Sequence, residues 1–245
     1  MRTVANPVEG TEVRVEPAES EGITINGVPV ELDNAVPVFR IDLRDGDRRT
    51  FIAEHVLSVL GLSGITAAEV TGVRTEWDFA RPEHRFAYST GSDPSTVVGH
   101  PAGLHNPVLA EALRTAETIE RGSEPRRSVS EPVEYGDGAI RIRPREYGSG
   151  LLINNHYEDG VKSFEVDPQA RDDEATIKEI VTSTTPFLTR RQEGLTHWIG
   201  DLVSDIGVIG GFDDLVIDSY SAGHDDTIGV SRKARDEGVV VERSG

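Results

Sequence analysis

The order of hydrophobic patterns is the feature that most constrains the fold of this chain, because it runs from strand-like to helix-like twice. In the first half, alternating apolar positions with turn signals at Asn26-Gly27 and Asp45-Gly46 predict strands. Thr50 is the expected cap of an apolar helix that ends near Gly61, and residues 65–70 predict a return strand. Strands followed by helices, twice over, favour an α+β fold of two similar layered halves.

The second half repeats this order of elements without repeating the sequence. Strands are expected at 132–135, 139–143, 150–157, 163–166 and 215–222, and helices at 172–180, 195–207 and 224–237. Residues 74–105 lack a clear period and predict a long loop, which a helix from Asn106 to about Glu120 follows. A polar segment at 123–131 is the expected linker between an N-terminal half, residues 1–122, and a C-terminal half, residues 132–245.

The charge of the chain excludes nucleic acid as a simple partner. Its 43 acidic residues against 25 basic ones give a net charge of −18, whereas nucleic-acid binding depends on Lys and Arg that neutralise phosphates. The lysines are only Lys162, Lys178 and Lys233. Such a composition is typical of proteins that stay soluble in concentrated salt, which screens self-repulsion. An ordinary acidic protein is the alternative.

The absence of cysteine restricts the metal sites that the chain can form. Any transition metal must bind to His, Asp or Glu side chains. No apolar run reaches the roughly 18–20 residues of a membrane helix, and residues 1–6 show no apolar leader. We therefore expect a cytoplasmic protein without a membrane span.

The helix expected at 195–207 carries His197, Asp201 and Asp205 at positions i, i+4 and i+8. This spacing puts the three side chains on one helix face, where a His and a carboxylate one turn apart can bind the same metal ion. Alone the pattern is weak, and a solvated polar face is the alternative.

Two further positions stand out among the histidines. Glu54-His55 interrupts an apolar helix, and glutamate is rarely buried without a partner. A histidine ligand beside a carboxylate that can act as a base suits a hydrolytic zinc site, with an outward-facing pair as the alternative. His224 opens the last helix, where a surface position in the first turn is the alternative.

Together these residues resemble the UDP-3-O-acyl-N-acetylglucosamine deacetylases. Residues 52–62 resemble the family's first zinc-binding helix, and the His-x-x-x-Asp-x-x-x-Asp-x-Gly motif at 197–207 resembles the second. The Ser-Ala-Gly-His turn at 221–224 resembles a late Ser-Gly-His motif. The resemblance covers roughly residues 1–73 and 131–245.

The resemblance implies a fold of two similar β-α-α-β layered halves with the active site between them. It also implies a Zn²⁺ ion held by His55, His197 and Asp201, with a water completing its coordination. A deacetylase mechanism needs further groups, which the resemblance assigns to Glu54 and His224.

Each of these groups has an implied role. Glu54 would be the general base that deprotonates the water. Protonated His224 would stabilise the oxyanion or protonate the leaving amine, and Asp205 would keep it charged. Thr185, or its neighbour Thr184, falls where the family has a threonine near the substrate carbonyl.

Two departures from the family change the expected substrate. The family's Gly-Leu-His-Thr/Ser-Gly loop is missing at residues 6–11, and Trp198 replaces a lysine that lies close to the substrate's diphosphate. Losing that cation in a protein of charge −18 disfavours a nucleotide diphosphate, whereas an aromatic ring can stack on a sugar or an acyl group.

The sequence therefore predicts a zinc-dependent N-deacetylase that acts on an acetylated amino sugar or a related small amide other than the lipid A precursor. Two alternatives remain open. The first is a non-catalytic zinc-binding relative that binds a ligand or serves as a subunit of a complex. The second is a metal-free protein in which the acidic helix face is solvated surface. The sequence predicts no oligomeric state.

Overall fold

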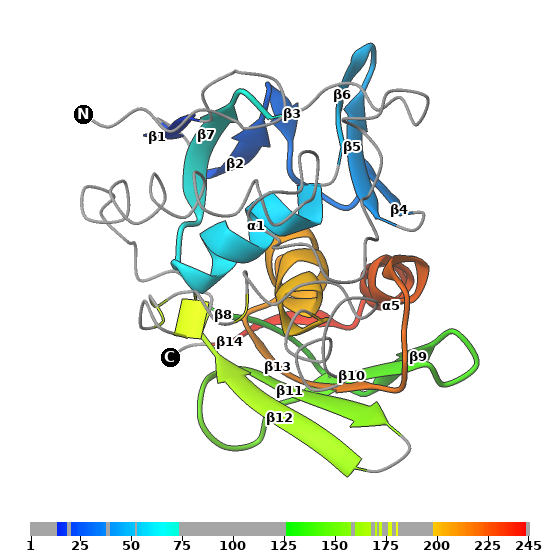
Figure 1. Cartoon of the computed structure of the whole chain (residues 1–245). Helices are drawn as coiled ribbons and strands as arrows, with labels where there is room; N and C mark the ends of the chain where they lie inside the picture. The colour runs from blue at the N-terminus through cyan, green and yellow to red at the C-terminus, as the bar shows by residue number, and fades with distance from the viewer. Residues whose placement is uncertain are drawn as a thin grey trace, which may run out of the picture.

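The structure of the chain is a computed structural model, and it combines strands and helices, as the sequence predicts. The model describes residues 14–18, 21–37, 40–51, 53–73, 126–157, 160–167, 170, 172, 176–177, 180 and 198–243. In that part of the chain the strands form four sheets and pack with three long helical segments (Figure 1). The mixed α+β class is confirmed.

The N-terminal strands form two small sheets. The first has the order β1-β7-β2-β3, with β1 at Arg14–Pro17, β2 at Gly22–Ile25, β3 at Val28–Pro29 and β7 at Ala67–Thr71. The second has the order β4-β5-β6, with β4 at Ala35–Pro37, β5 at Ile41–Asp45 and β6 at Arg48–Thr50. Asn26 and Gly27 both have positive φ between β2 and β3, which confirms the turn expected there.

The C-terminal strands form a mixed five-stranded sheet of order β12-β11-β13-β10-β9. Its strands are β9 at Val133–Tyr135, β10 at Ile140–Pro144, β11 at Gly150–Tyr157, β12 at Gly160–Val166 and β13 at Asp214–Ser219. β11 and β13 are parallel, and the other pairs are antiparallel. β8 (Arg126–Val129) pairs separately with β14 (Val240–Arg243).

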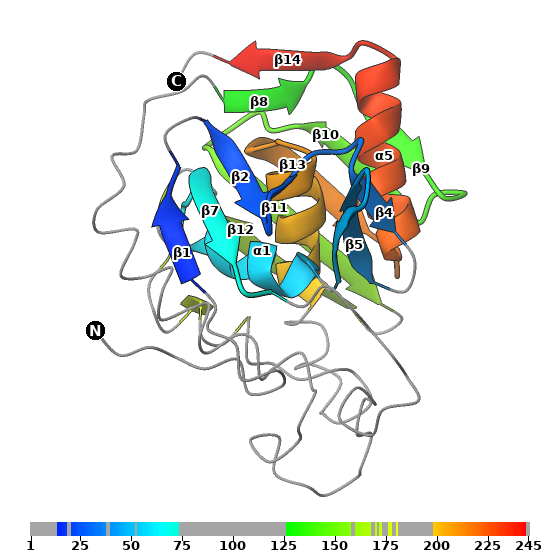
Figure 2. The same ribbon diagram turned by 90° about the horizontal axis from the view of Figure 1, so that it is seen from above.

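Three helical segments lie between these sets of strands (Figure 1). They are α1 at Ala53–Leu62, the central helix at residues 198–209 and α5 at His224–Asp236. The central helix is α-helical over 198–202 and continues as the π-helix η3 over Val203–Ile209. The central helix contacts both α1 and α5, and α5 also packs against β9 and β10, so the helices connect the two sets of strands (Figure 2).

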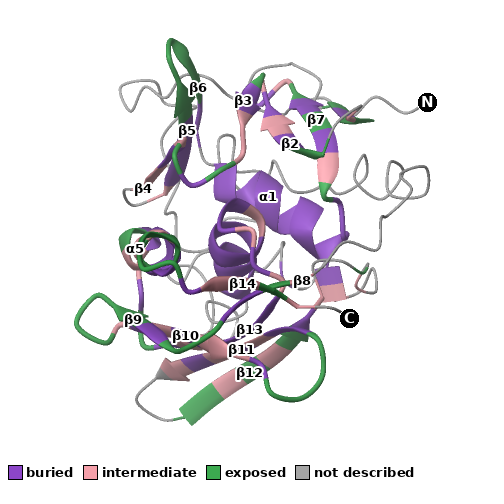
Figure 3. Ribbon diagram, turned by 180° about the vertical axis from the view of Figure 1, so that it is seen from behind, coloured by how far each residue is buried: buried purple, intermediate pink, exposed green. Residues whose placement is uncertain are grey.

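The crossing of α1 and the central helix is unusually close. Every residue of α1 that the structure describes is buried, as Figure 3 shows, whereas α5 buries one side only. A Cβ atom on Gly61 would lie 2.8 Å from side-chain atoms of both Val203 and Val208. The Ser58 hydroxyl lies 2.7 Å from the carbonyl oxygens of both Glu54 and Gly200, and so bridges the two helices.

Two local expectations differ from the structure. Thr50 ends β6 instead of capping α1, and its hydroxyl accepts a hydrogen bond (3.1 Å) from Asn26 Nδ2 in the turn between β2 and β3. Residues 126–129 lie within the expected linker but form β8, since β14 supplies a partner that no local pattern shows. The division into two halves at 1–122 and 132–245 stays a prediction.

Several other expectations fall on residues outside the described part. The loop at 74–105, the helix at 106–120 and most of the helix at 172–180 lie there. Among the helices that are described, none is long and apolar enough to span a membrane.

The close helix crossing predicts that Gly61→Ala lowers the free energy of unfolding by about 1–3 kcal/mol, because the added methyl overlaps Val203 and Val208. Urea unfolding measures this change. The double variant Gly61→Ala/Val208→Ala should recover part of the loss, since the two sites are in contact. Strictly additive effects of the two substitutions would contradict the proposed overlap.

The charge of −18 predicts that stability rises with salt. Glu16 and Glu69 are exposed and directly opposite each other on β1 and β7, so they contribute to the repulsion. Glu69→Gln should raise the free energy of unfolding by a few tenths of a kcal/mol in 0.05 M KCl, and less in 2 M KCl. Equal effects at the two salt concentrations would show that screening is not the cause.

Candidate functional site

Three helical segments bring their ionisable side chains together in the interior. Glu54 and His55 come from α1, Asp201 and Asp205 from the central helix, and His224 from the first turn of α5. All five are buried, from Asp205 at 0% exposure to His224 at 8%. Burial excludes the interpretations in which these residues are solvated surface groups.

Asp205 and His224 form a direct pair. His224 Nδ1 lies 2.7 Å from Asp205 Oδ2. α5 begins at His224 after Gly223, and its N-terminus therefore carries the imidazole toward the central helix. The pair confirms the expected contact between these two residues.

Asp205 lies in the π-helical part of the central helix. The Gly210 N–H donates to Asp205 O at 2.9 Å, which is a hydrogen bond between residues five apart. π-helical turns are rare and frequently mark functional sites. The sequence predicts an α-helix over 195–207. The prediction is confirmed over 198–202 and is wrong over 203–207, where the helix is a π-helix that continues to residue 209.

Glu54 is held in place by β5. The Ile41 N–H donates to Glu54 Oε2 at 2.9 Å, and Glu54 Oε1 lies 3.6 Å from His55 Nε2. Burial is the main cause that raises the pKa of Glu54 to about 8. The positive charge of His224 lowers this pKa, and the negative charge of Asp201 raises it. The charges of His224 and Asp201 thus both act on Glu54.

The second carboxylate in this cluster is similarly shifted. Burial raises the pKa of Asp201 to about 7, with the charge of His224 opposing and that of Asp205 adding to the rise. Two buried carboxylates therefore titrate near neutral pH, which is a departure typical of functional sites.

His224 is shifted in the direction of the protonated form. Burial lowers its pKa, but the charge of Asp205, the hydrogen bond with Asp205 and the charges of Asp201 and Glu54 outweigh this effect and raise the pKa to about 10. His224 is therefore an imidazolium at neutral pH.

Trp198 stands beside this cluster. Its ring centre lies 6.0 Å from that of His224, with the two planes tilted by 43°, and its Nε1 donates to Ser219 Oγ at 3.4 Å. The indole is half-buried against the core. The indole therefore neighbours His224.

Several supporting residues are not among those predicted from the sequence. Ile41, Ser204 and Thr227 hydrogen-bond to Glu54 or Asp205 in the structure. Ser204 neighbours Asp205 and Thr227 lies one turn after His224, so a search for hydroxyl groups at those spacings would have found these two. The Ile41 N–H comes from a distant strand.

The expected zinc ligands are described only in part. His55 and Asp201 lie in the cluster, whereas His197 is outside the described residues, as is Thr185, the expected substrate contact. Within the described residues, no three His, Asp or Glu side chains are grouped as the ligands of one metal ion. The donor set nevertheless fits zinc, since an imidazole and a carboxylate are ordinary zinc ligands and the two buried carboxylates with raised pKa would be compensated by a cation.

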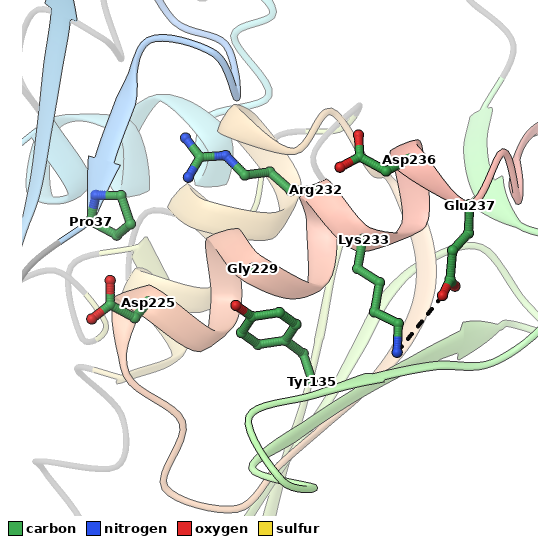
Figure 4. A pocket seen from close by; sticks show the side chains of 8 residues that line it. All are labelled: Pro37, Tyr135, Asp225, Gly229, Arg232, Lys233, Asp236 and Glu237. Carbon is green, nitrogen blue, oxygen red and sulfur yellow. Dashed lines mark ion pairs between the residues drawn. The ribbon is translucent and has the colours of Figure 1, made fainter.

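A separate open pocket of about 590 Å³ lies over the outward face of α5 (Figure 4). Pro37 and Tyr135 line it together with polar side chains of α5. Its two cations already have partners, because Arg232 donates to two backbone carbonyls of the β3–β4 region and Lys233 to Glu134 O. None of the site residues described above lines this pocket.

Comparison with known proteins assigns no family to the chain. No family model matches it, and no curated protein matches it. The resemblance to the deacetylases therefore depends on the residues and their arrangement alone.

The shift of His224 predicts a pH dependence of stability in the presence of a chelator. Because its pKa rises from 6.5 unfolded to about 10 folded, its stabilising contribution is complete below pH 6.5 and is lost as pH rises toward 10. One proton corresponds to at most about 1.4 kcal/mol per pH unit.

The measurement is urea unfolding between pH 6 and 10. His224→Gln should remove this part of the pH dependence, whereas His156→Gln, on the five-stranded sheet, should leave it unchanged. Parallel pH profiles for the wild type and His224→Gln would contradict the assigned protonation.

Proposed function

We propose that the chain is a zinc-dependent amide hydrolase that N-deacetylates an amino sugar or a related small amide. The observation that carries this proposal is the buried cluster in which three helical segments bring Glu54, His55 and Asp201 together with the directly paired Asp205 and His224. Such a cluster offers a base, an acid and a metal-binding carboxylate in one place. In this proposal the fold is that of the deacetylases, with two similar β-α-α-β layered halves and the site between them.

Zinc is the metal that the donor set suits best. His55, His197 and Asp201 would hold it, which is the combination of imidazole and carboxylate ligands that catalytic zinc sites use. When bound, zinc would lower the pKa of a water and polarise the substrate carbonyl.

Glu54 is the general base in this mechanism. Its carboxylate accepts the proton of the attacking water, and the hydrogen bond from Ile41 N to Oε2 keeps the side chain oriented. The pKa of about 8 without metal would fall beside a divalent cation, into the range in which a carboxylate acts as a base at neutral pH.

His224 is the acid. With a pKa raised to about 10 it carries a proton at neutral pH, which it can share with the developing oxyanion and deliver to the leaving amine. Its partner Asp205 stabilises the imidazolium through the 2.7 Å contact.

Trp198 and the overall charge favour an uncharged substrate. The indole lies beside His224, where its face can stack on a sugar ring or pack on an acyl group. A net charge of −18 repels a diphosphate. An acetylated amino sugar without phosphate groups fits both features.

The alternative is a zinc-binding relative that does not turn over substrate. The missing N-terminal loop and the replacement of lysine by Trp198 favour it. Retention of Glu54 and His224 opposes it, since neither is needed to hold the metal.

Metal content and turnover together test the proposal. The wild type and Glu54→Gln should each bind about one zinc, because Glu54 is not among the proposed ligands, and His197→Ala should lose it. Release of acetate from N-acetyl sugars should fall roughly 10²- to 10⁴-fold in Glu54→Gln. His156→Gln is the control and should match the wild type in both measurements.

Two outcomes would contradict the proposal in different ways. Zinc in the wild type without turnover of any N-acetyl sugar would favour the non-catalytic relative. A folded wild type that binds no zinc would contradict both readings of the site.

Trp198 predicts a specific kinetic effect. Trp198→Ala should raise KM for an N-acetyl sugar by roughly 2- to 10-fold with little change in kcat, because a stacking contact to the substrate is lost. Trp198→Phe should restore most of the affinity. A decrease in kcat with unchanged KM would show that the indole acts on His224 and not on the substrate.

A further inference from the structure

The Asp205 carboxylate receives more hydrogen bonds than its pairing with His224 requires. The Thr227 hydroxyl lies 2.6 Å from Asp205 Oδ2, the oxygen that also faces His224 Nδ1. The Ser204 hydroxyl lies 2.6 Å from Asp205 Oδ1. Both hydroxyl groups belong to residues that are at most 1% exposed. Three donors therefore surround one buried carboxylate.

Each hydroxyl has a single proton, and its distances indicate where that proton goes. Thr227 Oγ1 is nearer to Asp205 Oδ2 than to His224 O, which lies at 3.0 Å. Ser204 Oγ is nearer to Asp205 Oδ1 than to Asp201 O, which lies at 2.8 Å. A carboxylate is also the stronger acceptor, so both protons point to Asp205.

This arrangement fixes the plane of the carboxylate. Rotation of the Asp205 carboxylate would break at least one of these hydrogen bonds, and water cannot replace the lost bond in the interior. Since Asp205 takes the Nδ1 side of His224, Nε2 is the ring nitrogen that acts as the acid in the proposed mechanism. Thr227 is well suited to this task because its branched side chain is stiff at χ1.

We propose that Ser204 and Thr227 are positioning residues that lock Asp205 and thereby fix the orientation of His224. The inference rests on the proposed function, in which His224 is the acid. If the two hydroxyl groups only satisfied a buried carboxylate, His224 would keep its hydrogen bond to Asp205 after their removal.

The experiment compares isosteric, conservative and control variants. Thr227→Val and Ser204→Ala each remove one donor, and Thr227→Ser keeps the donor at position 227. Ser231→Ala is the matched control, because its buried hydroxyl lies on the same helix but donates to Thr227 O at 3.1 Å. Circular dichroism establishes that each variant is folded.

The first readout does not depend on activity. In protein labelled with ¹⁵N-histidine, the wild type should show a downfield, slowly exchanging Nδ1 proton of His224. Thr227→Val should shift this resonance upfield or lose it by exchange, while Thr227→Ser and Ser231→Ala should retain it. A resonance unchanged in both Thr227→Val and Ser204→Ala would overturn the proposal. If Thr227→Val does not fold, Ser204→Ala alone decides by the same criterion.

The second readout is kinetic. Loss of an outer hydrogen-bond partner typically costs 10- to 100-fold, and we expect that decrease in kcat for Thr227→Val, with KM nearly unchanged and recovery in Thr227→Ser. An unaltered kcat in Thr227→Val would overturn the proposal. A wild type without deacetylase activity would contradict the proposed function, and the proton resonance would then decide the role of the hydroxyl groups.

Discussion

The close approach of α1 to the central helix is the constraint on which the rest of the site depends. Gly61 leaves room for Val203 and Val208, and Ser58 connects the backbones of the two helices through Gly200. This contact brings Glu54 and His55, on one helix, to the same interior region as Asp201 and Asp205 on the other. Larger residues at the crossing would separate the helices and disperse the cluster.

The electrostatics of the site follow from this packing. Water is excluded from the crossing, so charged forms are costly unless they compensate one another. His224 supplies the positive charge among Glu54, Asp201 and Asp205, and these carboxyl groups raise its pKa. Burial raises the pKa values of Glu54 and Asp201. With pKa values of about 8 and about 7, Glu54 and Asp201 hold protons at neutral pH when no metal is bound. A divalent cation at this position would replace those protons.

The elements with strong local patterns could be predicted from the sequence, and those fixed by distant contacts could not. The apolar run of α1 and the position of His224 at the start of α5 are local signals, and both are confirmed. Thr50 was expected to cap α1 but bonds to Asn26, 24 residues earlier. The π-helical segment that carries Asp205 packs against α1, and the hydrogen bond from Ile41 to Glu54 joins two separate elements. Neither leaves a periodic pattern in the chain.

The proposed function depends above all on a zinc ion bound between α1 and the central helix. A crystal structure of the zinc-loaded protein, with anomalous data collected above and below the zinc edge, tests it most directly. We expect one strong anomalous peak at roughly 2.0–2.2 Å from a nitrogen of His55, a nitrogen of His197 and an oxygen of Asp201. A zinc-loaded crystal with anomalous peaks only on the surface, and none within reach of His55 and Asp201, would contradict it.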